Sequence, residues 1–306
     1  MIRFLMDDIM DVSIVIVSYN TRDLIRDCIF SVIEKTQGVT YEIIVVDNDS
    51  HDGSVEMLRS EFPDVVIVES GGNIGFGKAN NKGMSVAKGD YLFLLNSDTV
   101  LVNNAVAVFL DRMRQLERVG YTPGALGAVL IGPGGNTCHS YGHFITPASE
   151  FKEVLSKYLR FLKDKENTCP GRVMDMKPVD YVTGADMFVP KHVFDELGGF
   201  DPDYFMYCEE VDWQRRMADA GYGRFIVEGP EIIHLEGGSD GSGNKAWSPS
   251  RLTNLYKSRK IYRKKHYDRM LLPIFRLLLM IFDAPAIVLT SILNRRKDYL
   301  QLIKLK

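Results

Sequence analysis

The sequence predicts an α/β protein whose first hundred residues form an open, parallel β-sheet. Two observations predict it. Apolar, β-branched runs alternate four times with amphipathic stretches, and the connections between them are short. The first run, VSIVIVSY at 12–19, is also too apolar for a half-exposed strand and is typical of a central parallel strand. Such an alternation builds a parallel sheet with right-handed crossovers.

The strands and helices follow one another in a regular order. We predict strands at 12–19, 41–46, 64–68 and 91–95, and helices at 22–36, 53–61, 77–88 and 103–116. The first helix places Leu24, Ile25, Cys28, Ile29 and Val32 at helical spacing, and Gly38 ends it. In the less regular second half we predict strands at 125–131, 138–145 and 179–189, the last interrupted by TGAD, and helices at 149–163, 191–197 and within 200–222.

Composition and charge separate a body from a tail. With 306 residues, 45% of them hydrophobic, the chain can bury the core of one large domain. Residues 251–306 hold 14 Lys and Arg and three Asp, which gives this segment a charge of +11. Because the net charge of the whole chain is −3, residues 1–250 carry a charge of −14. An acidic body argues against a nucleic-acid partner, whereas a basic, apolar tail favours an anionic membrane surface.

The cysteines and the N-terminus indicate the compartment. The four cysteines are widely spaced and form no CxxC pair, so neither a zinc knuckle nor a redox dithiol is predicted. Residues 1–13 contain three Asp and lack the apolar core of a signal peptide. We therefore expect a cytoplasmic protein.

Polar residues follow each of the four strands, at the edge where α/β sheets bind ligands. They are SYN at 18–20, DNDS at 47–50, GGNIGFG at 71–77 and NSD at 96–98. Glycines in the loop 71–83 let backbone amides approach a pyrophosphate, and Asn73, Asn80 and Asn81 can contact ribose or phosphate oxygens. The alternative is that these glycines only form turns, since their spacing does not match the dinucleotide fingerprint.

Asp98 and His234 are the candidate metal ligands. Asp98 follows a buried strand and is suited to a hard divalent cation, although Asn96, Ser97 or Asp98 could instead cap the helix at 103–116. His234 ends the apolar segment EIIH, where a neutral imidazole could complete the same metal site. The other five histidines, at 51, 139, 143, 192 and 266, stand in no comparable group.

Glu209, Glu210 and Asp212 form an acidic cluster beside Tyr207 and Trp213. Mutual repulsion and partial burial would raise the pKa of at least one carboxyl group, as a general base for a sugar hydroxyl requires. The alternative is an acidic first turn that the helix dipole favours.

Taken in order, six motifs in residues 12–240 resemble glycosyltransferase family 2, in particular its rhamnosyltransferase-like members. They are SIVIVSYN, VVDNDSHDGS, NIGFGKANNKG, GDYLFLLNSDT, VTGADMFVPKHVFDELGGFDPDYFMYCEEVDWQRRMADAGY and HLEGGS. The resemblance implies a GT-A fold, a single Rossmann-like nucleotide-binding domain with a mixed central sheet. It also implies inversion at the anomeric carbon and Mg²⁺ or Mn²⁺ as cofactor. The expected donor is a nucleotide sugar, dTDP-rhamnose or a UDP-sugar, and the acceptor a glycan or lipid-linked oligosaccharide of cell-surface polysaccharide synthesis.

The resemblance also implies roles for individual residues. The nucleoside pocket is lined by Ser18, Tyr19, Asn20, Asp47 and Asn48, while Asn73, Gly75, Phe76 and Asn80 surround the ribose and phosphates. Asn96, Ser97 and Asp98 occupy the DxD motif, with Asp98 as metal ligand and His234 as a second ligand. Asn96 stands where the motif has its first Asp, which leaves the choice of donor open. In the acidic motif, Glu210 has the position of the base, with Glu209 and Asp212 as neighbours.

The C-terminal tail is predicted to be helical and membrane-associated. We expect a catalytic domain at 1–250 and a basic amphipathic tail at 251–306. Residues 270–293 are long enough to span a bilayer but carry Arg276, Asp283 and two prolines, and basic segments flank them. This favours a peripheral anchor on the inner face of the cell membrane. The alternative is a helix packed on the catalytic domain or on a second subunit, which leaves a homodimer possible.

Two other functions fit parts of the pattern. One is a catalytically inactive protein that binds sugar nucleotides or acts as a scaffold, although such a protein has no need of the acids at 209–212. The other is a nucleotidyltransferase of similar fold, although SYNTRDL lacks the glycine-rich loop expected after its first strand. An NAD-dependent dehydrogenase is disfavoured by the missing fingerprint.

Overall fold

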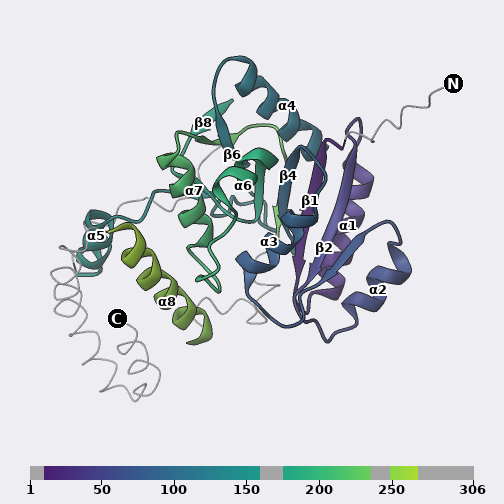
Figure 1. Ribbon diagram of the computed structural model, residues 1–306, viewed down its shortest axis with the longest axis horizontal. Helices are drawn as coiled ribbons and strands as arrows, with labels where there is room; N and C mark the ends of the chain where they lie inside the picture. The colour runs from purple at the N-terminus through teal and green to yellow at the C-terminus, as the bar shows by residue number, and fades with distance from the viewer. Residues whose placement is uncertain (1–9, 159–174, 236–248, 268–306) are drawn as a thin grey trace.

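The computed structural model describes residues 10–158, 175–235 and 249–267. Four parallel strands form one half of its main sheet (Figure 1). They are β1 (Val12–Ser18), β2 (Tyr41–Asp47), β3 (Val66–Glu69) and β4 (Tyr91–Asn96). β1 lies between β2 and β4 and is buried along its length, which explains its uninterrupted apolar sequence.

The second half of the chain completes a mixed sheet of eight described strands in the order β3-β2-β1-β4-β10-β6-β11-β8. The added strands are β6 (Pro123–Gly127), β8 (Met176–Pro178), β10 (Asp186–Pro190) and β11 (Gly223–Val227). β10 runs antiparallel to both of its neighbours, and β8 runs antiparallel to β11. Two short ribbons pair β5 (Thr99–Leu101) with β12 (Ile232–His234) and β7 (Tyr141–Gly142) with β9 (Tyr181–Val182).

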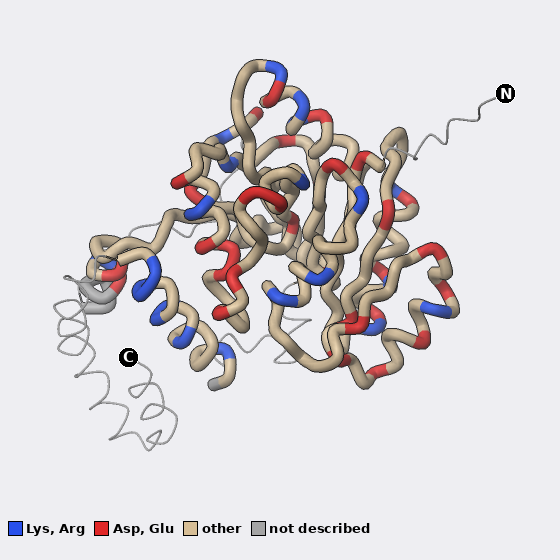
Figure 2. The backbone as a smooth tube through the Cα atoms, in the orientation of Figure 1, with Lys and Arg blue, Asp and Glu red and all other residues tan. Residues whose placement is uncertain are grey.

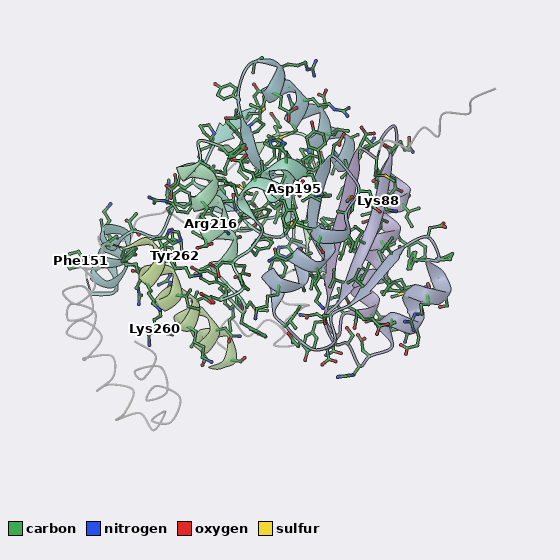
Figure 3. All side chains as sticks on the ribbon, in the orientation of Figure 1. Lys88, Phe151, Asp195, Arg216, Lys260 and Tyr262 are labelled. Carbon is green, nitrogen blue, oxygen red and sulfur yellow. The ribbon has the colours of Figure 1, made fainter. Side chains whose placement is uncertain are left out.

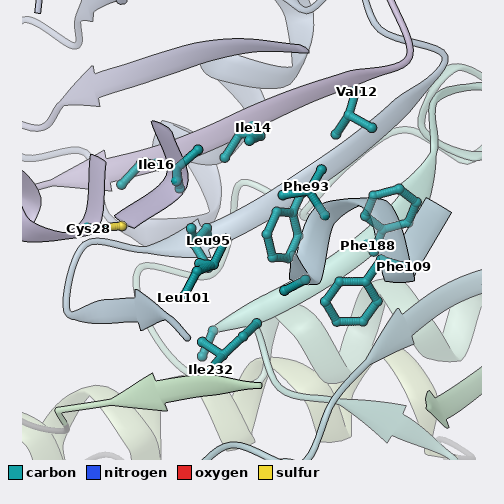
Figure 4. Packing of buried hydrophobic residues seen from close by; sticks show 14 of the residues in the cluster. Val12, Ile14, Ile16, Cys28, Phe93, Leu95, Leu101, Phe109, Phe188 and Ile232 are labelled. Carbon is teal, nitrogen blue, oxygen red and sulfur yellow. The ribbon is translucent and has the colours of Figure 1, made fainter. Parts of the chain in front are cut away.

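Helices cover both faces of the sheet. One face carries α1 (Arg22–Lys35), α2 (Ser54–Glu61) and α4 (Ala105–Arg118), and the other carries α3 (Phe76–Val86), α6 (Lys191–Leu197) and α7 (Glu209–Asp219). Alternation along β1 explains both layers, because Ile14 and Ile16 face the first set and Val15 faces the second. Figure 4 shows the first core, where Phe109 of α4 stacks on Phe188 of β10.

Two further helices, α5 (Pro147–Tyr158) and α8 (Pro249–His266), lie beside α7, on the side of the molecule away from α1 and α2 (Figure 1). Arg263 of α8 forms a nearly buried ion pair with Glu150 of α5, at 2.7 Å. Tyr262 and Tyr267 are buried in a third core cluster. The first part of the predicted tail therefore packs on the body, while the segment 270–293 lies outside the described residues.

The predicted elements of the first hundred residues agree with the structure to within two residues at nearly every boundary. Apart from β5, the differences lie in the second half. The predicted strand 179–189 is divided at TGAD into β9 and β10, which belong to different sheets, and β5, β8 and β11 were not predicted. The predicted helix 149–163 begins at Pro147, and its end lies outside the described residues. None of the helices in the described parts of the chain is both long and apolar enough to cross a bilayer.

Candidate active site

Parallel pairing brings the ends of three strands to one edge of the sheet. Ser18 of β1 lies opposite Asp47 of β2, and Val17 lies opposite Asn96 of β4. The polar residues that follow these strands therefore share one edge, where ligands of α/β sheets bind.

Asp47 offers an unused acceptor at this edge. Its Oδ2 accepts backbone hydrogen bonds from Asp49 at 3.2 Å and Ser50 at 3.1 Å. Its Oδ1 is buried and has no hydrogen-bond partner among the described residues. Since a buried carboxylate oxygen without a partner is costly, Asp47 is suited to accept a hydrogen bond from a ligand.

Several of the predicted donor-binding residues bind one another and form the frame of the edge. Asn48 accepts a hydrogen bond from the Ile74 amide at 3.0 Å and donates one to Asn73 at 3.2 Å, which fixes the glycine-rich loop to the end of β2. The Thr21 hydroxyl lies 3.1 Å from those of Ser18 and Ser97 and so joins the ends of β1 and β4.

The remaining predicted donor-binding residues differ in exposure. Tyr19 is 37% exposed, and Asn20, also exposed, accepts a hydrogen bond from the His51 amide at 2.8 Å. Asn80 is buried, and its side-chain amide donates to the Phe76 carbonyl within α3 at 3.1 Å. Tyr19 and Asn20 are therefore accessible to a ligand, whereas the Asn80 amide is already used in part.

The glycine-rich loop touches the segment that leads into α7. The Phe76 amide donates a hydrogen bond to the Phe205 carbonyl at 3.0 Å. Gly75 has a φ of +89°, and a Cβ at this position would lie 2.3 Å from the Phe205 carbonyl oxygen. Only glycine therefore allows these two segments to approach so closely.

Asp98 and His234 are brought together by the ribbon of β5 and β12. Because His234 pairs with Thr99 and the Leu235 amide donates to the Asp98 carbonyl at 2.9 Å, the two side chains become neighbours. His234 Nε2 lies 3.3 Å from Asp98 Oδ1. Asp98 is 2% exposed, and its Oδ1 accepts no hydrogen bond of good geometry from the described residues.

This pair could supply one oxygen and one nitrogen ligand to a divalent cation. No group of three or more His, Cys, Asp or Glu suited to a metal occurs in the described parts of the chain, so further ligands would have to come from elsewhere, such as donor phosphates. The capping alternative for Asp98 is wrong, because α4 begins at Ala105 after Asn104 and β5 intervenes.

The acid pair follows a strained turn. Tyr207 and Cys208 have φ angles of +71° and +66°, and α7 begins at the next residue, Glu209. Side chains other than Gly, Asn and Asp rarely adopt this conformation, and each instance costs about 1–3 kcal/mol. Such strain is concentrated at functional sites, because the surrounding contacts must maintain it.

Glu209 and Glu210 differ in accessibility. Glu209 is 3% exposed and lies over Gly77 of α3, and its Oε2 has no hydrogen-bond partner among the described residues. Burial and the charge of Glu210 raise the pKa of Glu209 well above its ordinary value. Burial also raises the pKa of Glu210, whose side chain keeps partial access to solvent. Glu210 is therefore the more accessible residue of the pair.

Asp212 has a different environment. Its carboxylate accepts hydrogen bonds from Arg216 at 3.0 Å and from His266 of α8 at 2.7 Å. Burial alone would raise the pKa of Asp212, but the His266 hydrogen bond and the Arg216 charge lower it overall. Asp212 is thus held as a paired anion, unlike Glu209 and Glu210. Sequence reasoning gave His266 no role, because 54 residues separate it from its partner.

Asp186 is a second residue that sequence reasoning missed. It is fully buried in β10 opposite Leu95, next to the end of β4. Its Oδ2 accepts a hydrogen bond from the Ala128 amide at 2.7 Å, and burial raises its pKa to about 7. The signal was an acid at the start of the apolar run ADMFVP.

Gly75→Ala should be markedly more destabilising than Gly71→Ala. Both glycines have positive φ, so either alanine introduces backbone strain of about 1–2 kcal/mol. Only at position 75 does the new methyl group collide with Phe205, which should cost at least about 2 kcal/mol more. Urea unfolding of both variants measures the difference. Equal losses would show that the contact between the two segments is looser than the structure indicates.

Comparison with known proteins places the chain among glycosyltransferases. The N-acetylglucosaminyl-diphospho-decaprenol L-rhamnosyltransferase of Mycobacterium tuberculosis is 25% identical over 216 residues, which cover 65% of this chain and 68% of the relative. Rhamnosyltransferase WbbL of Escherichia coli K12 is 28% identical over 232 residues, 73% of this chain and 83% of the relative. The low-salt glycan biosynthesis hexosyltransferase Agl10 of Haloferax volcanii is 27% identical over 205 residues, 66% and 60% of the two chains.

A solved structure shows the same fold. GalNAc-T7, crystallised with UDP, GalNAc and Mn²⁺, superposes with a TM-score of 0.55 at 18% identity, covering 83% of this chain and 48% of GalNAc-T7. The predicted GT-A fold with a mixed central sheet is confirmed. The model of Glycosyl transferase family 2 matches residues 13–171, more than half of the chain. The chain therefore belongs to glycosyl transferase family 2.

Proposed function

We propose that this glycosyltransferase inverts the anomeric configuration while it moves a sugar from a nucleoside diphosphate to an acceptor hydroxyl. The observation that carries the proposal is the contact between the glycine-rich loop and the acid pair. Phe205 accepts the Phe76 amide hydrogen bond, and Glu209 lies over Gly77. A base on α7 is therefore next to the loop that would hold the donor phosphates.

The reaction is a single displacement. Glu210 takes the proton from the acceptor hydroxyl, and the oxygen forms a bond to C1 as the bond from C1 to the diphosphate breaks. Attack from the face opposite the diphosphate inverts C1, and no covalent enzyme intermediate forms. Asp47 binds the nucleoside through its free oxygen. A Mg²⁺ or Mn²⁺ ion held by Asp98 and His234 would stabilise the negative charge on the diphosphate.

Rhamnose is the favoured sugar, because two relatives are named as rhamnosyltransferases. The donor is then dTDP-rhamnose, with a UDP-sugar as the alternative. A glycan or lipid-linked oligosaccharide is the acceptor, in line with the diphospho-decaprenol named for one relative. A lipid-linked acceptor also gives a reason for the basic tail, which would hold the enzyme at the inner face of the cell membrane.

Glu210→Gln should lower kcat at least about a hundredfold and leave the KM for the donor unchanged, since it removes a general base but no donor contact. The rising limb of the kcat pH profile should lie above the ordinary glutamate pKa in the wild type, because burial raises the pKa of Glu210. Glu209→Gln is the matched control. If Glu209→Gln is inactive and Glu210→Gln stays active, Glu209 is the base and the two roles are exchanged.

Asp98→Asn should abolish both sugar transfer and Mn²⁺-dependent binding of the nucleoside diphosphate. The substitution keeps the shape of the side chain but removes the charge that a hard cation requires. Calorimetric titration of UDP and dTDP with and without Mn²⁺ measures this loss. Unchanged transfer in excess chelator would contradict a metal-dependent mechanism.

Binding to liposomes should increase with anionic lipid and decrease with salt. Lys257, Lys260 and Lys264 are exposed along α8, which Figure 2 shows as a basic helix. Reversing these charges to Glu should weaken flotation, and deletion of residues 268–306 should abolish it. If flotation does not depend on lipid charge, the tail instead serves in packing or in subunit contacts.

A further inference from the structure

The turn at residues 206–208, directly before Glu209 and Glu210, depends on contacts from other parts of the chain for its conformation. Tyr207 and Cys208 both adopt the left-handed region, and neither is a residue that favours it. Two such residues in succession strain the backbone, and contacts with other parts of the chain must offset this strain. The direction in which Glu209 and Glu210 project depends on this turn, because α7 begins directly after it.

Helix α8 supplies contacts to this turn. The Ser258 hydroxyl donates a hydrogen bond to the Met206 carbonyl at 2.7 Å, one residue before the strained pair. Tyr262 is fully buried and packs with Cys208 and Val211 in the third core cluster. Figure 3 shows Tyr262 on the side of α8 toward the body, whereas Lys260 points away.

α8 also holds both sides of the acid pair. Before the pair, Lys265 forms ion pairs with Asp201 and with Asp203, the latter at 2.8 Å. After the pair, His266 Nε2 lies 2.7 Å from Asp212 Oδ1, and both side chains are largely buried. Asp212 is in turn the residue whose amide closes the first turn of α7, by donating to the Cys208 carbonyl at 2.9 Å.

We propose that α8 is a positioning element of the active site, and that Ser258 and His266 are the positioning residues that hold the turn 206–208 and the first turn of α7. Ser258 fixes the backbone entering the strained turn, and His266 fixes the anion two residues after Glu210. The proposal rests on the proposed function in one respect, that Glu210 is the base. It gives α8 a role in the chemistry, distinct from any role of the tail at a membrane.

If α8 were only a supporting helix, a different result would be expected. Loss of general support lowers stability and impairs every property of the enzyme together. A positioning contact, when broken, reduces kcat and leaves donor affinity nearly intact, because the donor residues lie on other strands and loops. The split between kcat and KM, and its rescue by a conservative substitution, therefore distinguishes the two roles.

The test compares His266→Ala, His266→Gln and Ser258→Ala with His192→Ala, a matched substitution at an exposed histidine on α6. His266→Ala should lower kcat about tenfold or more with the donor KM within about twofold, as expected for a misplaced catalytic group. His266→Gln, which can still donate to Asp212, should restore most of kcat. His192→Ala should behave as the wild type. Amide hydrogen exchange at residues 206–212 should accelerate in His266→Ala and in Ser258→Ala.

Three results would overturn the proposal. They are a wild-type kcat in His266→Ala, a parallel loss of kcat and donor affinity without rescue by His266→Gln, and unchanged exchange at 206–212. If the wild-type protein itself transfers no sugar from dTDP-rhamnose or UDP-sugars, the proposed function fails, and hydrogen exchange alone decides on α8. Faster exchange at 206–212 in both α8 variants then supports the positioning role, and unchanged exchange rejects it.

Discussion

The site depends on the parallel, in-register pairing of β1 with β2 and β4. This pairing places Ser18 opposite Asp47 and Val17 opposite Asn96, so that the loops after three strands meet at one edge. A shift of one residue would turn every side chain of a strand to the opposite face and bury its polar end in the core. The close packing of the β1 side chains in the two core clusters opposes such a shift. The core therefore fixes the geometry of the site.

Later segments of the chain add Asp98, His234 and the acid pair to that edge, and the acid pair requires a strained turn. β5 and β12 align Asp98 with His234 by ordinary ladder pairing, which needs no special residue. The acid pair instead requires two left-handed residues and a close approach to Gly75. Helix α8 packs against the strained turn at residues 206–208. Residues far along the sequence therefore stabilise a conformation that the local sequence disfavours.

Sequence reasoning succeeded where the signal is local and failed where it is not. Apart from β5, the strands and helices of residues 12–118 follow from hydrophobic periodicity, and the structure agrees. β11, with the sequence GRFIV, was missed because a five-residue strand gives little periodic signal. The pairing of Asp98 with His234 was suggested by their positions after apolar segments and by family resemblance, and the structure places the two side chains near each other. The contact of His266 with Asp212 has no spacing that could reveal it, since only the packing of α8 creates it.

Buried carboxylate oxygens that lack a good hydrogen bond give a physical reason to expect a ligand at the candidate active site. Asp47 Oδ1 and Glu209 Oε2 are buried without a hydrogen-bond partner among the described residues, and buried Asp98 Oδ1 accepts no hydrogen bond of good geometry there, although His234 Nε2 lies 3.3 Å away. Each such atom costs about 1–3 kcal/mol or more when charged, so a protein under selection for stability alone would pair them. Asp47 ends β2 and Asp98 follows β4, the strands on either side of β1, and Glu209 lies over the glycine-rich loop. A ligand that carries an N–H group and a cation would satisfy Asp47 and Asp98 in turn, and the proposed metal-bound nucleotide sugar has both.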